Sequence, residues 1–170
     1  MSDALYTGRR FRTLNVIDDY NRESLMIEPA FSLPASRVTQ LLTRLCDLRG
    51  CPEMIRVDNG PEFISETFKG WAKAKGILIH FIEPGKPAQN AYVERFNKSF
   101  RTEVLDINWF TSLGEVKRLA DEWRDIYNMQ RPHESLGGYA PIAFELKRSG
   151  ISSELIEEKL NLKTTGSLYF

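Results

Sequence analysis

The sequence has 170 residues, which is enough for one domain with a sizeable core. Hydrophobic residues make up 42% and charged residues 27%, a balance typical of globular proteins rather than disordered or membrane-spanning chains. No apolar run approaches the roughly 18 residues of a membrane span, and polar residues follow Met1 where a secretory signal would be apolar. Cys46 and Cys51 match no zinc or redox spacing. We therefore expect a cytoplasmic protein with no membrane partner and no disulfide framework.

The charge is balanced overall but uneven along the chain. The formal net charge is zero, whereas nucleic-acid-binding proteins usually carry a basic excess. Within residues 86–101, four basic side chains stand against one acid, while residues 151–159 hold three acids and one lysine. The distribution therefore leaves room for a local basic face.

The first thirty residues predict an antiparallel hairpin. Polar and apolar positions alternate near the end of the segment 9–17, as they do in a half-buried strand. Residues 18–22 form a polar turn, and residues 25–31 return as the second strand. Pro29 shifts the end of that strand towards the edge of a sheet.

The next fifty residues alternate between helix and strand patterns. Residues 34–49 repeat leucine at helical spacing, and residues 65–75 read as a second helix ended by a glycine. Residues 54–57 form a short apolar strand. The segment 77–82 has almost no polar alternation, which is typical of a central strand covered on both faces. This order predicts an α/β fold with a mixed sheet.

A proline-rich loop, residues 83–90, precedes a helix predicted over residues 91–105. One stripe of that helix is apolar and should be buried, and it comprises Val93, Phe96, Phe100 and Val104. A second stripe, well away from the first, comprises Glu94, Lys98 and Arg101. A capping box, Ser112–Glu115, opens a further helix. We expect a core over residues 1–146, with a C-terminal helix and tail over residues 147–170.

Two carboxylates stand out in this arrangement. Asp58 follows a strand directly and Glu94 lies on the helix, with 94 − 58 − 1 = 35 residues between them. Phosphodiester chemistry needs a nucleophile activated and a leaving oxygen stabilised, and two metal ions about 4 Å apart can do both. Mg²⁺ prefers carboxylate oxygens and water. We predict that Asp58 and Glu94 share a divalent cation, with Gly60 giving a tight turn because it tolerates positive φ.

Each of these features also has an ordinary interpretation. An Asp-Asn-Gly sequence by itself is most often just a turn. Lys98 and Arg101 could belong to a solvated helix face, and Glu94 could be an i,i+4 partner of Lys98. Spacing by itself does not decide between these interpretations.

Longer runs of sequence are more specific. They comprise residues 16–23, 57–63 and 84–97, followed by Glu103–Asp106, Tyr127–Asn128, Arg131–Leu136 and Pro141. Over residues 3–146, these runs resemble the catalytic core of insertion-sequence transposases in the retroviral-integrase superfamily, the DDE polynucleotidyl transferases. The 35-residue gap also resembles the spacing that this superfamily uses between its second and third acidic ligands.

The resemblance implies an RNase H-like fold, with a mixed five-stranded sheet flanked by helices. It also implies dependence on Mg²⁺ or Mn²⁺, 3′-end cleavage at the element ends and strand transfer into target DNA by a homo-oligomer. Asp58 corresponds to the second ligand and Glu94 to the third. Lys98 and Arg101 fall where the family places DNA-contacting basic residues. Tyr92, which could stack on a base, and Asn90 are further candidates for DNA contact.

The sequence departs from the family pattern at its start. The family's first aspartate lies in a Trp-x-x-Asp-Phe run on the first strand, and residues 1–5 resemble the segment just after it. We therefore expect the first ligand upstream of Met1, and an inactive fragment that binds metal weakly. Asp3 could substitute only in another strand register. Asp18 and Asp19 are interpreted as structural caps or turn formers.

The remaining candidates have ordinary interpretations. His80 is predicted to be a packed core residue, as are Trp71 and Trp123. His133 could cap the preceding helix or approach DNA. The leading hypothesis is an enzyme core for DNA transposition. A second is a non-catalytic DNA-binding or oligomerisation remnant of a truncated element, and a third is an RNase H-fold nuclease acting on RNA–DNA hybrids.

Overall fold

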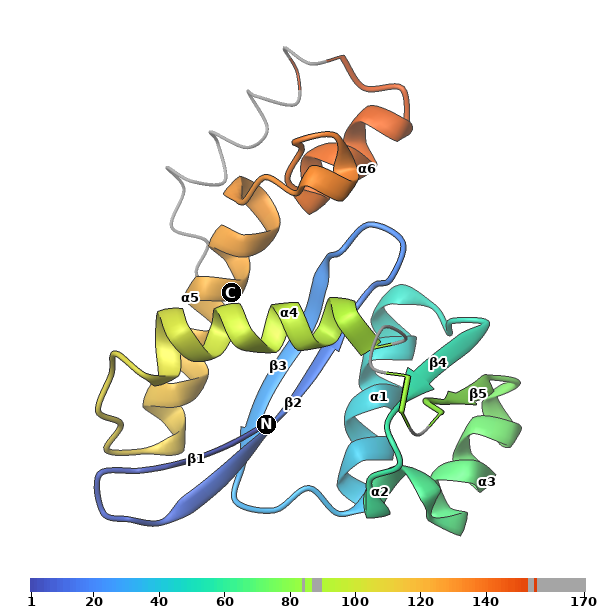
Figure 1. The fold of residues 1–170 in the computed structure, drawn as a ribbon. Coiled ribbons are helices and arrows are strands. Elements are labelled where there is room, and N and C mark those ends of the chain that lie inside the picture. Colours follow the sequence, from blue (N-terminus) through green and yellow to red (C-terminus); the bar gives the residue numbers. More distant parts are fainter. Residues whose placement is uncertain (84, 87–89, 153–154, 156–170) are drawn as a thin grey trace.

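The computed structural model describes residues 1–83, 85–86, 90–152 and 155 (Figure 1). In chain order, the elements are β1 (Ser2–Ala4), β2 (Arg10–Ile17), β3 (Ser24–Ala30), α1 (Ala35–Arg49), β4 (Met54–Val57), α2 (Pro61–Ile64), α3 (Glu66–Lys75), β5 (Leu78–Phe81), α4 (Ala91–Phe100), the π-helical turn η2 (Arg101–Leu105), α5 (Leu113–Gln130), the 3₁₀ turn η3 (Glu134–Leu136) and α6 (Pro141–Arg148). The predicted α/β class is confirmed.

The N-terminal strands form an antiparallel sheet in the order β1-β2-β3. The predicted hairpin is present, with Asn15 of β2 opposite Ile27 of β3 and a register shift between Val16 and Ile17. Pro29 lies opposite Thr13 in β3, which is an edge strand of this sheet. The prediction that Pro29 marks a sheet edge is therefore confirmed, as expected for a residue without a backbone N–H.

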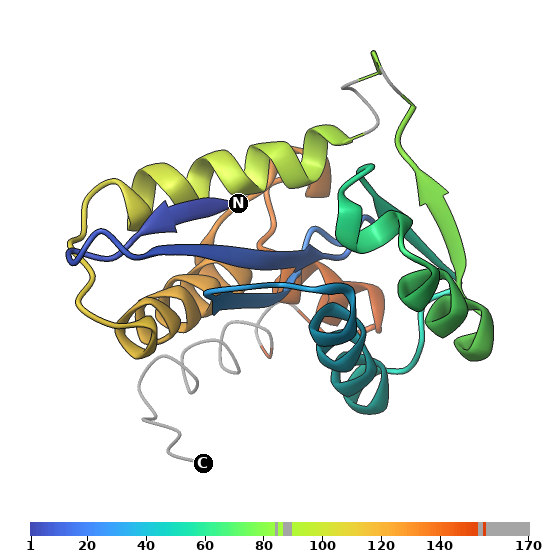
Figure 2. The same cartoon turned by 90° about the horizontal axis from the view of Figure 1, so that it is seen from below.

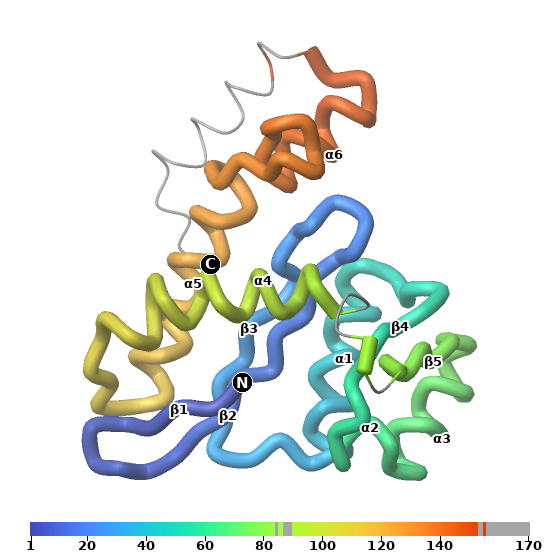
Figure 3. Tube along the Cα trace, in the orientation of Figure 1, coloured from blue at the N-terminus to red at the C-terminus, as the bar shows by residue number. Residues whose placement is uncertain are grey.

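The strands β4 and β5 form a separate parallel pair, with Val57 opposite Phe81. The predicted mixture of parallel and antiparallel pairing is therefore present, but the five strands are divided into sheets of three and two. Within the described residues, no backbone hydrogen bond joins the two sheets. Figure 3 shows the trace of α1, α2, α3, β4 and β5 gathered on one side of the molecule.

The prediction of a central strand at residues 77–82 is wrong. β5 pairs with β4 alone among the described strands, and its side chains alternate between exposed and half-buried. Leu78 is 68% exposed, and His80 is exposed rather than packed in a core. An apolar run without alternation can therefore form an edge strand with one open face, because length and composition do not report how many neighbours a strand has.

β2 separates two cores because its side chains alternate between the two faces of the sheet. Phe11 lies on one face, in a core that includes Phe96 and Phe100 of α4 and Trp123 of α5. Leu14 lies on the other face, with buried residues of α1 and with Phe68 of α3. Figure 2 shows α4 along one face of the three-stranded sheet and α1 on the other side. Trp123 is buried, as predicted.

The predicted helices are present with nearly the expected bounds. In α3, the side chain of Ser65 accepts a hydrogen bond from the Phe68 N–H, and Gly76 ends the helix in the left-handed conformation at φ +70°. Trp71 is half-buried and donates its indole N–H to Thr43 Oγ at 2.9 Å. The core interpretation of Trp71 therefore holds for most of its ring, with a polar partner for its nitrogen.

The helix predicted over residues 91–105 changes its winding after Phe100. α4 is α-helical as far as Phe100, and residues Arg101–Leu105 continue it as a π-helical turn. Phe96, Phe100 and Val104 are buried as predicted. The capping box is present in altered form, because Ser112 Oγ accepts from the Glu115 N–H while Glu115 accepts from the N–H of Thr111.

The C-terminal part is described only as far as residue 152, with residue 155 beyond it. α6 runs across residue 146, where the core was predicted to end. Of the C-terminal helix and tail expected over residues 147–170, the structure describes only residues 147–152 and 155. Among the helices that the structure does describe, none combines the length and the apolar character needed to cross a bilayer.

Candidate active site

A cavity of about 600 Å³ lies between the two sheets. β2 lines it from one side and β4 from the other, while residues of α1 lie beneath. Asp58 and Glu62 stand in its wall, together with Asn90, Val93 and Asn97 from the start of α4. The end of β4 and the N-terminal half of α4 therefore meet at one hollow.

Asp58 is the first residue after β4, and local hydrogen bonds hold it there. Asp58 Oδ1 accepts from the backbone N–H of Gly60 at 2.9 Å, which closes the turn. The side chain of Asn59 donates to the carbonyl oxygen of Ile82 at 2.9 Å and so ties the turn to the end of β5. Asp58 is exposed and makes no ion pair within the described residues. Its carboxylate keeps acceptor capacity for a further partner.

Glycine is needed at position 60 because the side chains of Asp58 and Glu62 lie close to its Cα, and not because the backbone there needs a positive φ. Its φ is −60°, a value that any residue adopts, so the predicted use of positive φ is wrong. A Cβ atom built at Gly60 would lie 2.9 Å from Asp58 Oδ1 and 3.3 Å from the carboxyl carbon of Glu62. A side chain at this position would therefore displace the Asp58 carboxylate.

Two polar contacts fix α4 over the three-stranded sheet. Asn97 Oδ1 accepts from the side-chain amide of Asn15 on β2 at 2.7 Å. One turn further on, Arg101 donates to the carbonyl oxygen of Ser2 at 2.8 Å and lies 3.6 Å from the carboxylate of Asp3. These contacts, with the buried ring of Phe96, set the rotation of α4 about its axis.

That rotation leaves Glu94 beside the cavity and open to solvent. Glu94 is about 60° around the helix from Asn97 and about 100° from Val93, both of which line the cavity, whereas Glu94 itself does not. Within the described residues, Glu94 makes no ion pair, and in particular none with Lys98. The ordinary interpretation as an i,i+4 partner of Lys98 is therefore not supported.

The donor chemistry at this site fits a hard divalent cation. Asp58 and Glu94 offer carboxylate oxygens with no cationic side chain paired to them, and Mg²⁺ is commonly held by one or two carboxylates while it keeps several waters. In the part of the chain that the structure describes, no group of three or more His, Cys, Asp or Glu side chains is placed to hold a metal. The sharing of one ion by Asp58 and Glu94 therefore stays a prediction.

The side chains of the other predicted DNA-contacting residues differ in their exposure and in their contacts with the rest of the described chain. Lys98 is exposed, and its side chain has no partner in the described part of the chain. Arg101, by contrast, is engaged by Ser2 and Asp3 as described above. Tyr92 is 45% exposed, but the guanidinium of Arg22 lies 3.4 Å from its ring centroid. Asn90 precedes α4, lines the cavity and makes no capping hydrogen bond.

The aspartates of β1 and of the turn after β2 have structural partners. Asp3 lies in β1 opposite Phe11 and contacts Arg101. Asp18 Oδ1 accepts from the backbone N–H of Tyr20 at 2.7 Å, the hydrogen bond of an Asx turn, so the turn-forming interpretation is confirmed. Asp19 forms an ion pair with Arg56 at 2.5 Å.

Sequence reasoning missed Glu62 and Asn15 as residues of the site. The Glu62 side chain is 8% exposed, lines the cavity and is paired with Arg12. Asn15 Oδ1 is buried without a hydrogen-bond partner among the described residues. A signal was available for Glu62, which falls in the first turn after Pro61, four residues beyond Asp58. No periodicity could show that Asn15 of β2 would meet Asn97 of α4.

The Met1 amino group also lines the cavity and responds to these carboxylates. Burial, Arg12 and Arg101 lower the pKa of this amine, while Asp58 and Glu62 act in the opposite direction. Asp58 and Glu62 therefore offset only part of the effect of burial and the two arginines, and the net shift disfavours the protonated amine.

Comparison with known proteins identifies the family. Models described as integrase core domain match residues 2–87 and 75–141, and the first match spans 87 − 2 + 1 = 86 of the 170 residues. An uncharacterized 39.2 kDa protein of insertion element IS476 from Xanthomonas euvesicatoria is 44% identical over 142 residues, covering 84% of this chain and 41% of the relative. An uncharacterized 31.7 kDa protein of insertion element IS407 from Burkholderia multivorans is 42% identical over 145 residues, covering 85% and 52%.

A more distant relative is the putative transposase InsK of insertion element IS150 from Escherichia coli, at 25% identity over 141 residues, 81% of this chain and 49% of the relative. The chain thus spans about half the length of these curated relatives.

Solved structures show the same fold. The HTLV-2 integrase catalytic core domain in complex with magnesium, in its trimeric form, matches with a TM-score of 0.62 at 16% identity, covering 84% of this chain and 92% of that one. A chain of the simian T-cell lymphotropic virus intasome matches with a TM-score of 0.61 at 15% identity, covering 78% and 47%. These neighbours show an RNase H-like fold, as the resemblance implied. Together with the family-model matches and the insertion-element relatives above, this shows that the chain belongs to the integrase core domain family.

Proposed function

We propose that this chain is the catalytic core of a DNA transposase that cleaves and joins DNA strands with Mg²⁺ or Mn²⁺ held by Asp58 and Glu94. The observation that carries the proposal is the meeting of the end of β4 and the N-terminal turns of α4 at one cavity, with Asp58 in its wall and Glu94 beside it, neither in an ion pair within the described residues. The integrase core relationship and the relatives encoded by insertion elements support it.

The chain's own residues have separate roles in this proposal. Bound metal ions would activate the attacking oxygen and stabilise the leaving oxygen at a phosphodiester. Asp58 is held by the Gly60 N–H, and Glu94 projects from a helix whose rotation Asn97 fixes. Lys98 follows Glu94 by one turn, where its ammonium would contact a DNA phosphate. Tyr92 and Asn90, at the start of α4, would contact the bound strand, and Arg101 would add to the local positive potential.

The test is titration of the chain with Mn²⁺, followed by calorimetry. We expect Asp58→Asn and Glu94→Gln each to weaken binding about tenfold or more, a loss of roughly 1.4 kcal/mol per tenfold step. Asp125→Asn and Glu122→Gln, exposed carboxylates on α5, are the matched controls and should bind as the unchanged chain does. Unaltered Mn²⁺ binding by both site variants would refute the assignment of the ligands.

We also propose that the isolated chain is a weak enzyme. Its two carboxylates are one fewer than the three of the DDE pattern, and no third metal-binding side chain joins them within the described residues. A gel assay with a labelled duplex that carries element ends should show little cleavage even in Mn²⁺. Vigorous cleavage that Asp58→Asn abolishes would contradict this expectation while supporting the enzyme class. Binding of duplex DNA without any binding of Mn²⁺ would favour a non-catalytic remnant.

Two coarser expectations belong to the same proposal. We propose that the chain assembles as a homo-oligomer on DNA, since transposition joins two element ends. One HTLV-2 neighbour is described as trimeric and another as dimeric. Light scattering with and without duplex DNA tests this.

We also propose a core over residues 1–146 and a separate helix and tail over 147–170, and limited proteolysis should then cut after the core first.

A further inference from the structure

A second cavity, of about 450 Å³, lies on the other side of Tyr92 from the site. Three arginines line it from distant parts of the chain, Arg22 after β2, Arg95 on α4 and Arg131 after α5. Glu134 is the one acid in its lining, so the count is 3 − 1 = +2 in a chain whose net charge is zero. We call this cavity the arginine pocket.

The three guanidinium groups are not neutralised equally. Arg131 is paired with Glu103, but Arg22 and Arg95 have no ion pair in the described part of the chain. Arg22 is held in place by stacking over the ring of Tyr92, at 3.4 Å from its centroid, and by a long contact of 3.5 Å from its Nε to Ser135 Oγ. Like charges gathered without a counter-ion repel one another, and a bound anion would relieve that repulsion.

Two polar nitrogen atoms in this lining lack partners. Nη1 of Arg22 and Nε2 of His133 are both buried, and neither has a hydrogen-bond partner among the described residues. Leaving a buried donor unpaired is unfavourable, and more so for a charged group. Both atoms belong to residues that line the pocket, so an anion bound there would bring acceptor oxygens to both walls that these residues form.

His133 reports the electrostatics of this pocket. Burial lowers the pKa of its imidazole, and Arg131, Arg95 and Arg22 lower it further. Glu134, beside it in the chain, is the acidic side chain of the lining and is exposed. The imidazole is therefore neutral at pH 7, when one of its nitrogens carries a hydrogen that can be donated.

We propose that the arginine pocket binds a backbone phosphate of the DNA strand that passes the first cavity, beside Asp58 and Glu94. Ile17 and Tyr92 line both cavities, so the two hollows adjoin. Guanidinium forks match phosphate oxygens in geometry and charge, and phosphate contacts fix the register of a protein on DNA. The inference deepens the proposed function, because it assigns Arg22, Arg95 and His133 to holding the strand beside the reacting centre.

The first test measures DNA affinity in EDTA, so it does not depend on the metal ligands. A fluorescein-labelled duplex is titrated at several salt concentrations by anisotropy. Loss of one phosphate contact lowers the slope of log K against log [salt] by about 0.9. We expect that decrease, with weaker binding, for Arg22→Gln and Arg95→Gln, and substantial recovery for Arg95→Lys. The matched control is Arg44→Gln, since Arg44 is exposed on α1, on the other side of the sheet, and forms no ion pair with any described residue.

The second test uses the two histidines of the chain as NMR probes. Inorganic sulfate, compared with chloride at equal ionic strength, should raise the pKa of His133 and shift its Cε1–H resonance. Exposed His80 should not respond, and His133→Gln assigns the two signals. Arg95→Gln should weaken the response to sulfate, and circular dichroism melting confirms that each variant is folded.

The outcomes separate this inference from the proposed function. If Arg22→Gln and Arg95→Gln change DNA affinity and its salt slope no more than Arg44→Gln does, or if sulfate leaves His133 unchanged, the inference is wrong. Neither result bears on Mn²⁺ binding by Asp58 and Glu94. Conversely, Asp58→Asn should leave the sulfate response of His133 intact, and a loss of that response would overturn the assignment of the pocket as a separate anion site.

Discussion

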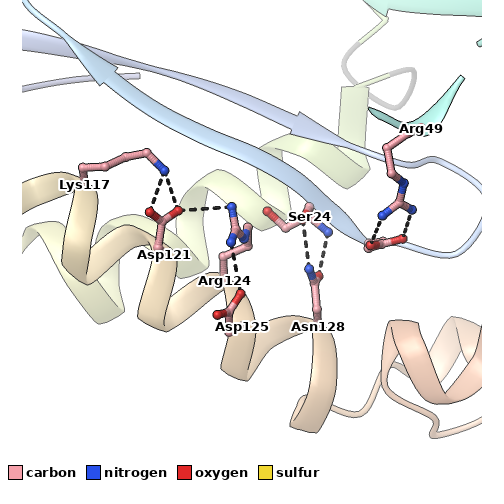
Figure 4. A network of polar contacts seen from close by, with 8 residues as sticks. Ser24, Arg49, Lys117, Asp121, Arg124, Asp125 and Asn128 are labelled. Atoms are coloured by element: carbon pink, nitrogen blue, oxygen red, sulfur yellow. Dashed lines mark hydrogen bonds and ion pairs between the residues drawn. The ribbon is translucent and has the colours of Figure 1, made fainter. Parts of the chain in front are cut away.

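The side chain of Asn128 on α5 pairs with the backbone of Ser24, the first residue of β3, as a neighbouring strand would. Its side-chain Oδ1 accepts from the Ser24 N–H at 2.7 Å, and its Nδ2 donates to the Ser24 carbonyl oxygen at 2.9 Å (Figure 4). Both residues are buried, and Ser24 lies opposite Ile17, next to the register shift of the hairpin. We predict that Asn128→Ala is strongly destabilising.

The magnitude follows from the groups that lose their partners. Asn128→Ala leaves the N–H and the carbonyl of Ser24 unpaired in a buried place, at about 1–3 kcal/mol each, or about 2–6 kcal/mol together. Truncation to alanine leaves space in which a water molecule can replace part of the pairing, so we expect about 2–4 kcal/mol. At about 2–4 °C per kcal/mol for a domain of this size, the midpoint of thermal unfolding should fall by roughly 5–15 °C.

Urea unfolding followed by tryptophan fluorescence measures this loss. Asp125→Ala, on the same helix and in an exposed ion pair with Arg124, is the control and should change stability by less than about 0.5 kcal/mol. Asn128→Asp keeps an acceptor for the Ser24 N–H but sets a charge beside the Ser24 carbonyl. Burial raises the pKa of such a carboxyl, so this variant should be less destabilised at acidic pH, where the protonated group can donate. A loss from Asn128→Ala no larger than that of the control would refute the reasoning.

Three further outcomes are expected. Gly60→Ala should weaken Mn²⁺ binding in calorimetry with little change in the melting midpoint, since the added Cβ meets Asp58 Oδ1 at 2.9 Å; unchanged affinity would contradict the close-approach argument. Phe100→Ala, at a fully buried ring in contact with Trp123, should cost about 3–5 kcal/mol in urea unfolding. The Arg131 contact, then the Trp123 N–H, lower the pKa of Glu103, so the stability that Glu103 adds is present above pH 4.5 and is lost as pH falls through its lowered pKa. Glu103→Gln should therefore flatten the acid limb of the stability–pH curve, and an unaltered limb would be inconsistent with this.

The helices were predictable from sequence because each carries its own signals. Ser65 and Gly76 mark the ends of α3 by local hydrogen bonding, and both could be recognised before the fold was known. The hairpin was predictable for the same reason. The burial of β5 was not, because whether His80 faces a neighbouring strand or solvent depends on pairing between distant segments.

In the candidate site, too, residues with a local sequence pattern could be proposed in advance, whereas contacts between distant segments could not. Asp58 and Glu94 could be proposed as ligands from sequence, since each lies in a run with a local pattern and the two are separated by a characteristic spacing, and that assignment stays a prediction. The arginine pocket was not, because Arg22, Arg95 and Arg131 come together only through the docking of α4 and α5 on the sheet. Likewise, Asn15 shows no pattern in β2 that would indicate its hydrogen bond to Asn97.

The division of the strands into two sheets has a consequence for dynamics. With no backbone ladder between them in the described residues, the unit formed by β4, α3 and β5 can open without breaking the pairing of β1, β2 and β3. Asp58 belongs to the first unit, whereas α4, which carries Glu94, is packed on the second. An ion held by both side chains would link the two units. Amide exchange in β4 and β5 would then become slower as more of the protein holds the ion.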